Sequence, residues 1–327
     1  MSSVGASVMV KQEEGGALSG PNGMVAKPMS LYTGALIEGV DLRGKLLPEQ
    51  IAFIRQMLLR WKVVFFRDQF LDHVQQVRFA ACFGNLTTGH PVYGGGVEGH
   101  PQVYSVAKLR HSKRQVGEKL MRTWTGWHAD VTPAHNPPFA SILRADQIPP
   151  YGGDTQWTNC AVAYQRLSPV MQKIVEGLRG LHSYHPKPGL KGSAEYRATI
   201  EKKALCTEHP LVTVHPETGE KILYVSPTFL ESIVGLSPRE NQAMLELLWE
   251  HVSQQEFTAR FRWEVGSVAF WDNRAALHLA PTDIFHMDCD RQMYRVTLVG
   301  EVPVGVDGRP STCISGDPVL AAEAANI

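Results

Sequence analysis

Hydrophobic residues recur along this chain in two spacings, one typical of helices and the other typical of strands. Residues 46–60 carry apolar side chains on one stripe from Ile51 to Leu59, at the spacing of an amphipathic helix. The run at residues 62–67 follows directly, and its β-branched and aromatic side chains are typical of a buried strand. The pattern therefore predicts a helix that leads straight into a strand.

Two further segments begin with helix signals. Residues 71–83 have helical spacing, and Asp72 stands where a side chain can cap the first turn. Residues 237–255 begin with Ser237, and Glu240 follows three residues later in the pattern of a capping box. Both segments are predicted to be helices.

From about residue 102 onward, short apolar runs recur between glycine and proline residues. The runs are VYSVA, FASILRA, LVTVH, KILYV, SVAFW and YRVTLVG. Short strands at this spacing favour a sandwich or barrel over a doubly wound sheet, so the expected fold class is mainly β with flanking helices. No linker divides the body, and we expect a single domain over residues 29–305. A disordered tail is expected at residues 1–28, which are small, polar and rich in glycine, and a C-terminal tail at residues 306–327.

Composition and charge narrow the classes of function. The 32 Lys+Arg balance the 32 Asp+Glu, which argues against a nucleic-acid binder that works by bulk electrostatics. No apolar run approaches the roughly 18–20 residues of a membrane span. The five scattered cysteines include no Cys-x-x-Cys, which indicates a reducing cytoplasm and neither a disulfide framework nor a structural zinc module. We therefore expect a cytoplasmic protein that works without nucleic acid or membrane.

The segment WHADVT carries the first candidate chemistry. In an extended chain His128 and Asp130 point to the same side, and one imidazole with one carboxylate makes two-thirds of a facial triad for non-haem Fe(II). His-x-Asp is common by chance, so a surface or capping role is the alternative. The candidate third ligand is His278, which follows a strand that ends at Trp271; its alternative is a core or rim histidine.

A pair of arginines forms the second candidate group. Arg291 and Arg295 are four residues apart and share a side if they lie on a strand. Two guanidinium groups directed into a barrel are costly unless anions meet them, and their planar donors suit a carboxylate. The alternative is a pair of exposed charges on an edge strand.

Taken together, these residues carry a family resemblance. The chain resembles the TauD/TfdA family of Fe(II)- and 2-oxoglutarate-dependent dioxygenases from about Met29 to Val304. The resemblance is densest in WHADVTP, PPYGGDTQWTN, HPETGEKILYVSPTF, WDNRAALHLAPTD and RQMYRVTLVGEVP, in the family's order and spacing. It implies a double-stranded β-helix, a cupin-like jelly-roll barrel flanked by helices, and a homo-oligomer, either a dimer or a tetramer.

The resemblance also implies roles for individual residues. His128, Asp130 and His278 would be the catalytic iron ligands, with Fe(II) as the metal. Thr155 and Arg291 would hold the distal carboxylate of the cosubstrate 2-oxoglutarate, and O₂ would be the second cosubstrate.

Five residues are assigned to the primary substrate by the same resemblance. Arg295 would lie near its acidic group and also touch the cosubstrate, and His90, Trp124, Val131 and Phe229 would line the pocket. Trp124 stands near a position where taurine-type members carry a polar residue, which favours a bulkier and more apolar substrate than taurine.

The implied activity is hydroxylation of a small or medium anionic substrate of the sulfate ester, sulfonate or aryloxyalkanoate type, with succinate and CO₂ as products. One alternative is a zinc hydrolase that uses the same triad, although hydrolysis gives the Arg/Thr clamp no role. The other is a non-catalytic cupin-like binding protein. We expect loops at residues 103–122 and 183–207 to decide the substrate.

Overall fold

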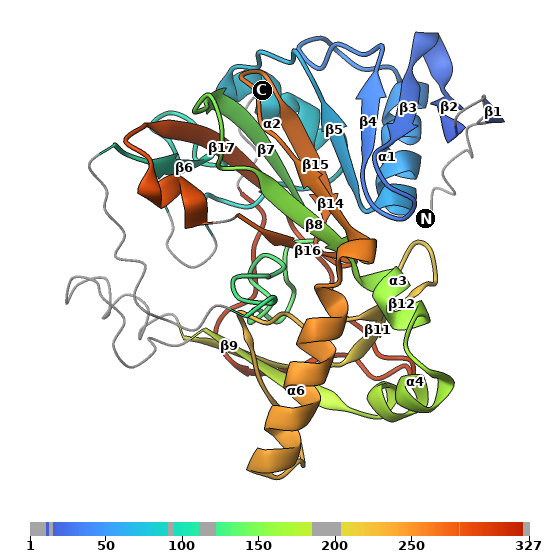
Figure 1. Ribbon diagram of the computed structural model, residues 1–327. Helices are drawn as coiled ribbons and strands as arrows, with labels where there is room; N and C mark the ends of the chain where they lie inside the picture. Colours follow the sequence, from blue (N-terminus) through green and yellow to red (C-terminus); the bar gives the residue numbers. More distant parts are fainter. Residues whose placement is uncertain are drawn as a thin grey trace.

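The largest element of the protein is a nine-stranded sheet, seen here in a computed structural model that describes residues 11–12, 16–90, 95–110, 122–184, 204–280 and 282–322 (Figure 1). Strands β4 and β5 are parallel, and all other neighbours in this sheet are antiparallel. In spatial order, the strands are β1 (Lys11–Gln12), β2 (Leu18–Ser19), β3 (Val25–Pro28), β4 (Ala35–Glu38), β5 (Val63–Phe66), β15 (Val268–Asp272), β7 (Ala140–Gln147), β17 (Arg291–Leu298) and β6 (Tyr104–Lys108).

A three-stranded sheet faces the large one across a buried apolar layer. It contains β14 (Thr258–Phe261), β8 (Thr155–Asn159) and β16 (Ala276–Leu279) in that order. Phe65 of the large sheet stacks on Phe261 of the small one, with ring centroids 4.2 Å apart, and Trp157 and Trp271 fill the same layer. Burial of aromatic side chains from both sheets stabilises this arrangement. The expected mainly β, jelly-roll fold class is confirmed.

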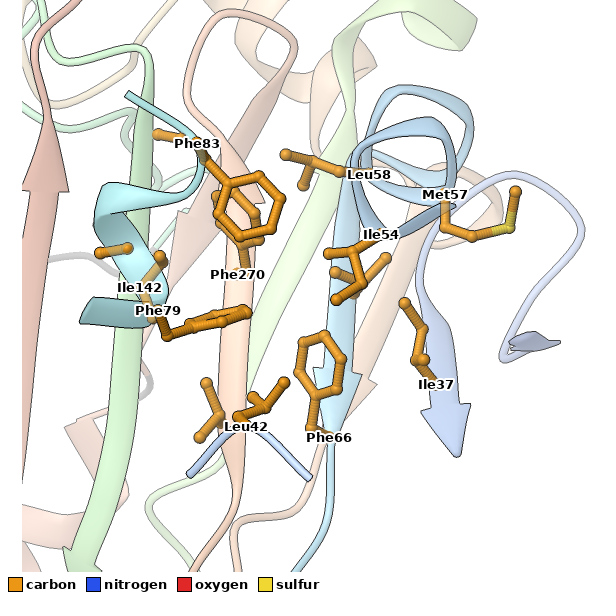
Figure 2. Close-up of a cluster of buried hydrophobic side chains, with 14 of the residues drawn as sticks. Ile37, Leu42, Ile54, Met57, Leu58, Phe66, Phe79, Phe83, Ile142 and Phe270 are labelled. Atoms are coloured by element: carbon orange, nitrogen blue, oxygen red, sulfur yellow. The ribbon is translucent and has the colours of Figure 1, made fainter. Parts of the chain in front are cut away.

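Two helices cover the other face of the large sheet. Helix α1 (Pro48–Trp61) and helix α2 (His73–Ala81) lie where the sequence predicts them, and Asp72 caps α2 by accepting a hydrogen bond from the Gln75 amide at 2.7 Å. Figure 2 shows their buried side chains meeting the strand residue Phe270. The large sheet is therefore packed on both faces, against these helices on one and the small sheet on the other.

The remaining elements form a second body beside the two sheets (Figure 1). A four-stranded sheet has the order β13 (Leu230–Ile233), β9 (Arg179–Tyr184), β10 (Leu205–Pro210) and β18 (Thr312–Ser315), and a hairpin joins β11 (Val212–Val214) to β12 (Lys221–Leu223). The helices here are α3 (Cys160–Gln165), α4 (Pro169–Glu176) and α6 (Pro238–Val252). Helix α6 begins as predicted, because the Glu240 carboxylate accepts a hydrogen bond from the Ser237 amide at 2.9 Å.

The expected boundaries of the domain need correction at both ends. Residues 18–28 were expected in a disordered tail, yet β2 and β3 extend the large sheet there and Met24 and Ala26 are fully buried. At the other end, β18 pairs with β10, and Val319 is buried against Val131 and its neighbours. Such short strands are stabilised by their partners, which the local sequence does not reveal.

The two expected specificity loops lie partly outside the described residues. Residues 111–121 and 185–203 are not described; residues 104–108 belong to β6, residues 183–184 to β9 and residues 205–207 to β10. The described residues also include the short 3₁₀ helices η2 (Pro21–Gly23), η3 (Gln255–Phe257) and η4 (Thr282–His286). Within the described part of the chain, none of the helices is long and apolar enough to cross a membrane.

Candidate metal centre and active site

His128, Asp130 and His278 come together as the sequence predicts. The segment of His128 pairs with β16, so that the His128 amide donates to the His278 carbonyl at 3.0 Å and the His278 amide donates back at 2.7 Å. The two imidazole centroids are 4.2 Å apart. One ligand atom from each of the three residues lies within 4.8 Å of the others, so the group can hold one metal ion.

Both histidines are in the state that a metal requires. Nδ1 of His128 lies 2.9 Å from the Gly126 carbonyl, which can only accept, so Nδ1 carries the proton and Nε2 keeps its lone pair for a metal. Burial lowers the pKa of His128 and brings the pKa of His278 to about 3. Nδ1 of His278 is buried without a hydrogen-bond partner among the described residues, as expected of a site built for a further ligand.

Both oxygens of the Asp130 carboxylate accept hydrogen bonds. Oδ2 accepts a hydrogen bond from the Ser141 hydroxyl at 2.6 Å, and Oδ1 accepts one from Nη1 of Arg295 at 2.6 Å. Burial by itself would raise the pKa of Asp130, but Arg295, the two neighbouring histidines and Ser141 hold that pKa well below its usual range. The carboxylate is therefore ionised at neutral pH, and a cation is its natural partner.

The residue after this ligand has a strained backbone. Val131 has a φ of 51°, a left-handed conformation that β-branched residues rarely adopt. Its side chain is buried with Ala134, Leu205 and Val319. The surrounding packing thus holds a turn that directs Asp130 toward the histidines, and a substrate contact for Val131 remains a prediction.

Arg291 contacts the segment that leads into Thr155, because Gly153 lies two residues before that threonine. Nη2 of Arg291 donates to the Gly153 carbonyl at 3.2 Å, and Thr155 Oγ1 accepts from the Trp263 indole at 2.9 Å. Nε of Arg291 is buried and has no partner among the described residues. Burial lowers the pKa of Arg291 to about 10, a shift that Asp283 opposes. A buried cation with an unused donor fits an anionic ligand such as a carboxylate.

Arg295 lies on the same side of β17 as Arg291, and Met293 between them is buried in the layer between the sheets. Its guanidinium lies 5.5 Å from the ring centroid of Tyr104, and its Nε has no partner among the described residues. Burial, followed by the charge of Arg295, lowers the pKa of His90 to about 3. His90 is therefore uncharged at neutral pH and could meet an anion only as a hydrogen-bond donor.

The predicted aromatic residues lie in different places. Phe229 meets the ring of His128 edge-on, with centroids 6.1 Å apart, and so forms a wall beside the triad. Trp124 packs against Trp249 of helix α6, with centroids 6.3 Å apart. The structure brings Phe229 to the metal candidates, whereas the substrate contact of Trp124 remains a prediction.

Several supporting residues carry no signal of their own in the sequence. Ser141 and Trp263 hold Asp130 and Thr155, and Asp283 accepts a hydrogen bond from the Gly153 amide at 3.3 Å. A serine within a strand is ordinary, and only the strand pairing shows what it faces. Asn273 is different: its place shortly before His278 suggests a supporting role, and its Oδ1 does accept from the Asp130 amide at 3.2 Å.

A cavity of about 240 Å³ lies between loops of the second body and the turn after β15. Asn273 and Arg274 form part of its wall, but His128, Asp130 and His278 do not. The chemistry of the triad and the two arginines, and not the size of this cavity, therefore locates the candidate active site.

Comparison with known proteins gives a consistent result. Residues 26–297 match the model of the family described as "Taurine catabolism dioxygenase TauD, TfdA family". The chain is 38% identical to an alpha-ketoglutarate-dependent sulfate ester dioxygenase of Pseudomonas putida, over 87% of this chain and 92% of the relative. It is 35% identical to an alkylsulfatase of Acinetobacter baylyi, over 84% of each chain.

Solved structures agree with the sequence comparison. Two structures from Burkholderia xenovorans match with TM-scores of 0.80 and 0.79, at 59% and 57% sequence identity. Each match covers 90% of this chain, with 100% of the first structure and 97% of the second. The second is described as a taurine dioxygenase.

Proposed function

Because this chain belongs to the TauD/TfdA family and is therefore an α-ketoglutarate-dependent dioxygenase, we propose that it oxidises sulfate esters of apolar alcohols. The relative from Pseudomonas putida is named a sulfate ester dioxygenase, and this chain is similar to it along nearly its whole length. One observation carries the proposal: Arg295, a cation with a buried and unused Nε donor, lies beside the metal candidates at hydrogen-bond distance from Asp130. A sulfate group offers that guanidinium a matching anion.

Fe(II) is the metal that fits the triad. Two neutral imidazoles and one ionised carboxylate leave positions open for other ligands, which is the donor set of non-haem iron oxygenases. In this assignment His128, Asp130 and His278 hold the ion. Bound there with 2-oxoglutarate, the iron supplies the activation of O₂ and the removal of hydrogen from an unactivated C–H bond, for which the side chains have no equivalent.

The protein's own residues bind, orient and exclude water. Arg291 and Thr155 hold the distal carboxylate of 2-oxoglutarate, and Asp283 keeps the backbone of Gly153 in place beside that clamp. Arg295 receives the sulfate, and Phe229 presents an apolar wall to the chain of the alcohol. This arrangement fixes one C–H bond toward the metal, and a 1 Å displacement there can cost roughly a hundredfold in rate.

The proposed reaction cleaves the sulfate ester by oxidation. An alkyl sulfate, 2-oxoglutarate and O₂ yield an aldehyde, hydrogen sulfate, succinate and CO₂. One oxygen atom enters the new carboxylate of succinate and the other hydroxylates the carbon that bears the sulfate. That carbon then forms a carbonyl, the C–O bond to sulfate breaks, and sulfate leaves with the electron pair while the hydroxyl proton is released.

A sulfonate is the second candidate substrate. The solved protein described as a taurine dioxygenase is 57% identical to this chain, which favours it. A sulfonate offers Arg295 the same tetrahedral anion, so both substrates use one site. The family resemblance assigns the bulky Trp124 to the substrate pocket, and such a residue there would favour the more apolar ester.

Product formation with a matched pair of substrates tests the proposal. We expect succinate and inorganic sulfate in equal amounts from hexyl sulfate under Fe(II), 2-oxoglutarate and O₂, and a lower kcat/KM for taurine. A higher kcat/KM for taurine would transfer the function to sulfonates. Normal succinate formation by His128→Ala, Asp130→Ala or His278→Ala, each shown to be folded by circular dichroism, would refute the triad.

We also propose a cellular compartment for the enzyme on the basis of its cysteines. All five cysteines are free in the structure, and Cys82 and Cys313 are exposed, which supports a reducing compartment such as the cytoplasm. The dimer or tetramer implied by the resemblance remains a prediction, and its test is the mass of the purified protein in solution.

A further inference from the structure

Asp130, Asn273 and Ser141 form a closed ring of hydrogen bonds. The Asp130 amide donates to Oδ1 of Asn273 at 3.2 Å, and Nδ2 of Asn273 donates to the Ser141 hydroxyl oxygen at 3.0 Å. The Ser141 hydroxyl then donates to Oδ2 of Asp130 at 2.6 Å, which closes the ring. Backbone and carboxylate of one residue are thus tied to the same amide side chain.

The ring is buried and its donors are fixed. Ser141 is fully buried, and Asn273 is only 3% exposed. The indole of Trp271 also donates to Oδ1 of Asn273, at 2.9 Å, which holds the amide with its oxygen toward Asp130 and its nitrogen toward Ser141. A hydroxyl has one proton. Because the Ser141 oxygen accepts from Asn273, that proton is donated to Asp130.

The two carboxylate oxygens are therefore not equivalent. Oδ2 is engaged by a neutral hydroxyl inside the ring, whereas Oδ1 meets Nη1 of Arg295, which lies outside the ring on another strand. A cation can take the place of the arginine at Oδ1 without breaking the ring. At Oδ2 it would leave Ser141 and Asn273 buried with unsatisfied groups, which is costly.

We propose that Asn273 is a positioning residue that acts through Ser141: it reserves Oδ2 of Asp130 for the hydrogen-bonded ring and presents Oδ1 alone to the metal. This inference rests on the proposed function, in which Asp130 is a metal ligand. It also gives the Asp-Asn pair at residues 272–273 two distinct tasks, because Asp272 binds Arg274 and His215 in a separate buried network.

Binding of Co(II) alone, followed anaerobically by its visible absorption, tests the proposal without substrate or cosubstrate. We expect Asn273→Ala and Ser141→Ala each to weaken Co(II) roughly 10–100-fold, the usual cost of losing a residue that orients a ligand. Because both act along one path, the double variant should bind no more weakly than the worse single variant. Ser141→Thr keeps the hydroxyl and should stay close to the unaltered protein.

Asn159 provides a matched control. It is as buried as Asn273, and its side chain caps α3 by accepting from the amides of Ala161 and Val162 at 3.0 and 3.2 Å. Asn159→Ala should lower the melting temperature without changing the affinity for Co(II). A structural effect on stability is thereby separated from an effect on the metal.

The outcomes distinguish this inference from the proposed function. Unchanged Co(II) affinity in Asp130→Ala would refute the triad itself. Loss of affinity in Asp130→Ala together with full affinity in Asn273→Ala and Ser141→Ala would overturn the ring while leaving the triad in place. Additive losses in the double variant, or a Ser141→Thr variant as weak as Ser141→Ala, would likewise overturn the path through Ser141. Should Asn273→Ala fail to fold, the Ser141 pair decides the question by itself.

Discussion

Nη1 of Arg295 donates to Oδ1 of Asp130 across 2.6 Å, so a metal-ligand candidate and an anion-binding candidate share one hydrogen bond. Arg295 belongs to β17, whereas Asp130 lies in the turn that follows the strand-like segment of His128. Both groups are shielded from solvent, with side chains 12% and 5% exposed. The contact links the proposed metal site to the proposed substrate site, and the first prediction concerns it.

Arg295→Ala should weaken an anionic substrate much more than a neutral one. A hydrogen bond to a charged group contributes about 1.5–3 kcal/mol, so we expect KM for hexyl sulfate to rise roughly tenfold to a hundredfold. Steady-state succinate formation with hexyl sulfate and with an uncharged alcohol of equal length measures the difference. An equal loss with both substrates would show that Arg295 serves the cosubstrate instead.

Arg291→Ala should raise the KM for 2-oxoglutarate by a similar factor. The variant leaves the distal carboxylate without its charged partner, and Thr155 alone offers only a neutral hydroxyl. Arg291→Lys keeps the charge but loses the planar pair of donors. Its KM for 2-oxoglutarate should therefore lie between those of the unaltered protein and of Arg291→Ala. The measurement is the initial rate against 2-oxoglutarate at saturating substrate. An unchanged KM would assign the carboxylate to another residue.

Asp272→Ala should destabilise the fold strongly. The Asp272 carboxylate is fully buried and accepts hydrogen bonds from Arg274 at 2.6 and 2.9 Å and from His215 at 3.0 Å. Removing it breaks a largely buried ion pair, which typically costs about 3–5 kcal/mol, and leaves Arg274 only its ion pair with Glu217 at 2.8 Å. Urea unfolding of the metal-free protein measures the loss. The exposed pair of Asp41 and Arg43 is the control. Asp41→Ala should unfold at the same urea concentration as the unaltered protein.

Acid should destabilise the protein through histidines that are buried in the neutral form. Burial lowers the pKa of His209 to about 3, whereas a histidine in the unfolded chain titrates near about 6.5. Below about pH 6.5 the unfolded state therefore binds more protons, and the free energy of unfolding falls as the pH drops toward 3. One such group contributes a slope of up to about 1.4 kcal/mol per pH unit.

His209→Gln isolates this contribution. Nε2 of His209 donates to the Thr132 carbonyl at 2.7 Å, and a glutamine amide can donate without titrating. We expect urea unfolding at pH 7.5, 6.5 and 5.5 to show that the free energy of unfolding falls less steeply with decreasing pH in the variant. This holds even if the variant is less stable at pH 7.5. A slope equal to that of the unaltered protein would contradict the assignment.

Local pattern was enough to predict helices α1, α2 and α6. Each has an apolar stripe, and two of them have a capping side chain, Asp72 or Ser237, next to the first turn. The short apolar runs predict six of the strands, β6, β7, β11, β12, β15 and β17. Residues 18–28 were not, because β2 and β3 are too short to carry a pattern and are stabilised by their neighbours in the sheet.

For the site, the sequence by itself determined the residue types: an imidazole and a carboxylate two positions apart, a distant second imidazole, and two arginines four positions apart. Only the tertiary structure decided that His278 pairs through its backbone with His128, that Ser141 and Arg295 take separate oxygens of Asp130, and that Trp124 packs against Trp249. Spacing along a strand fixes which side a residue faces, but strand pairing between distant segments fixes what it meets there.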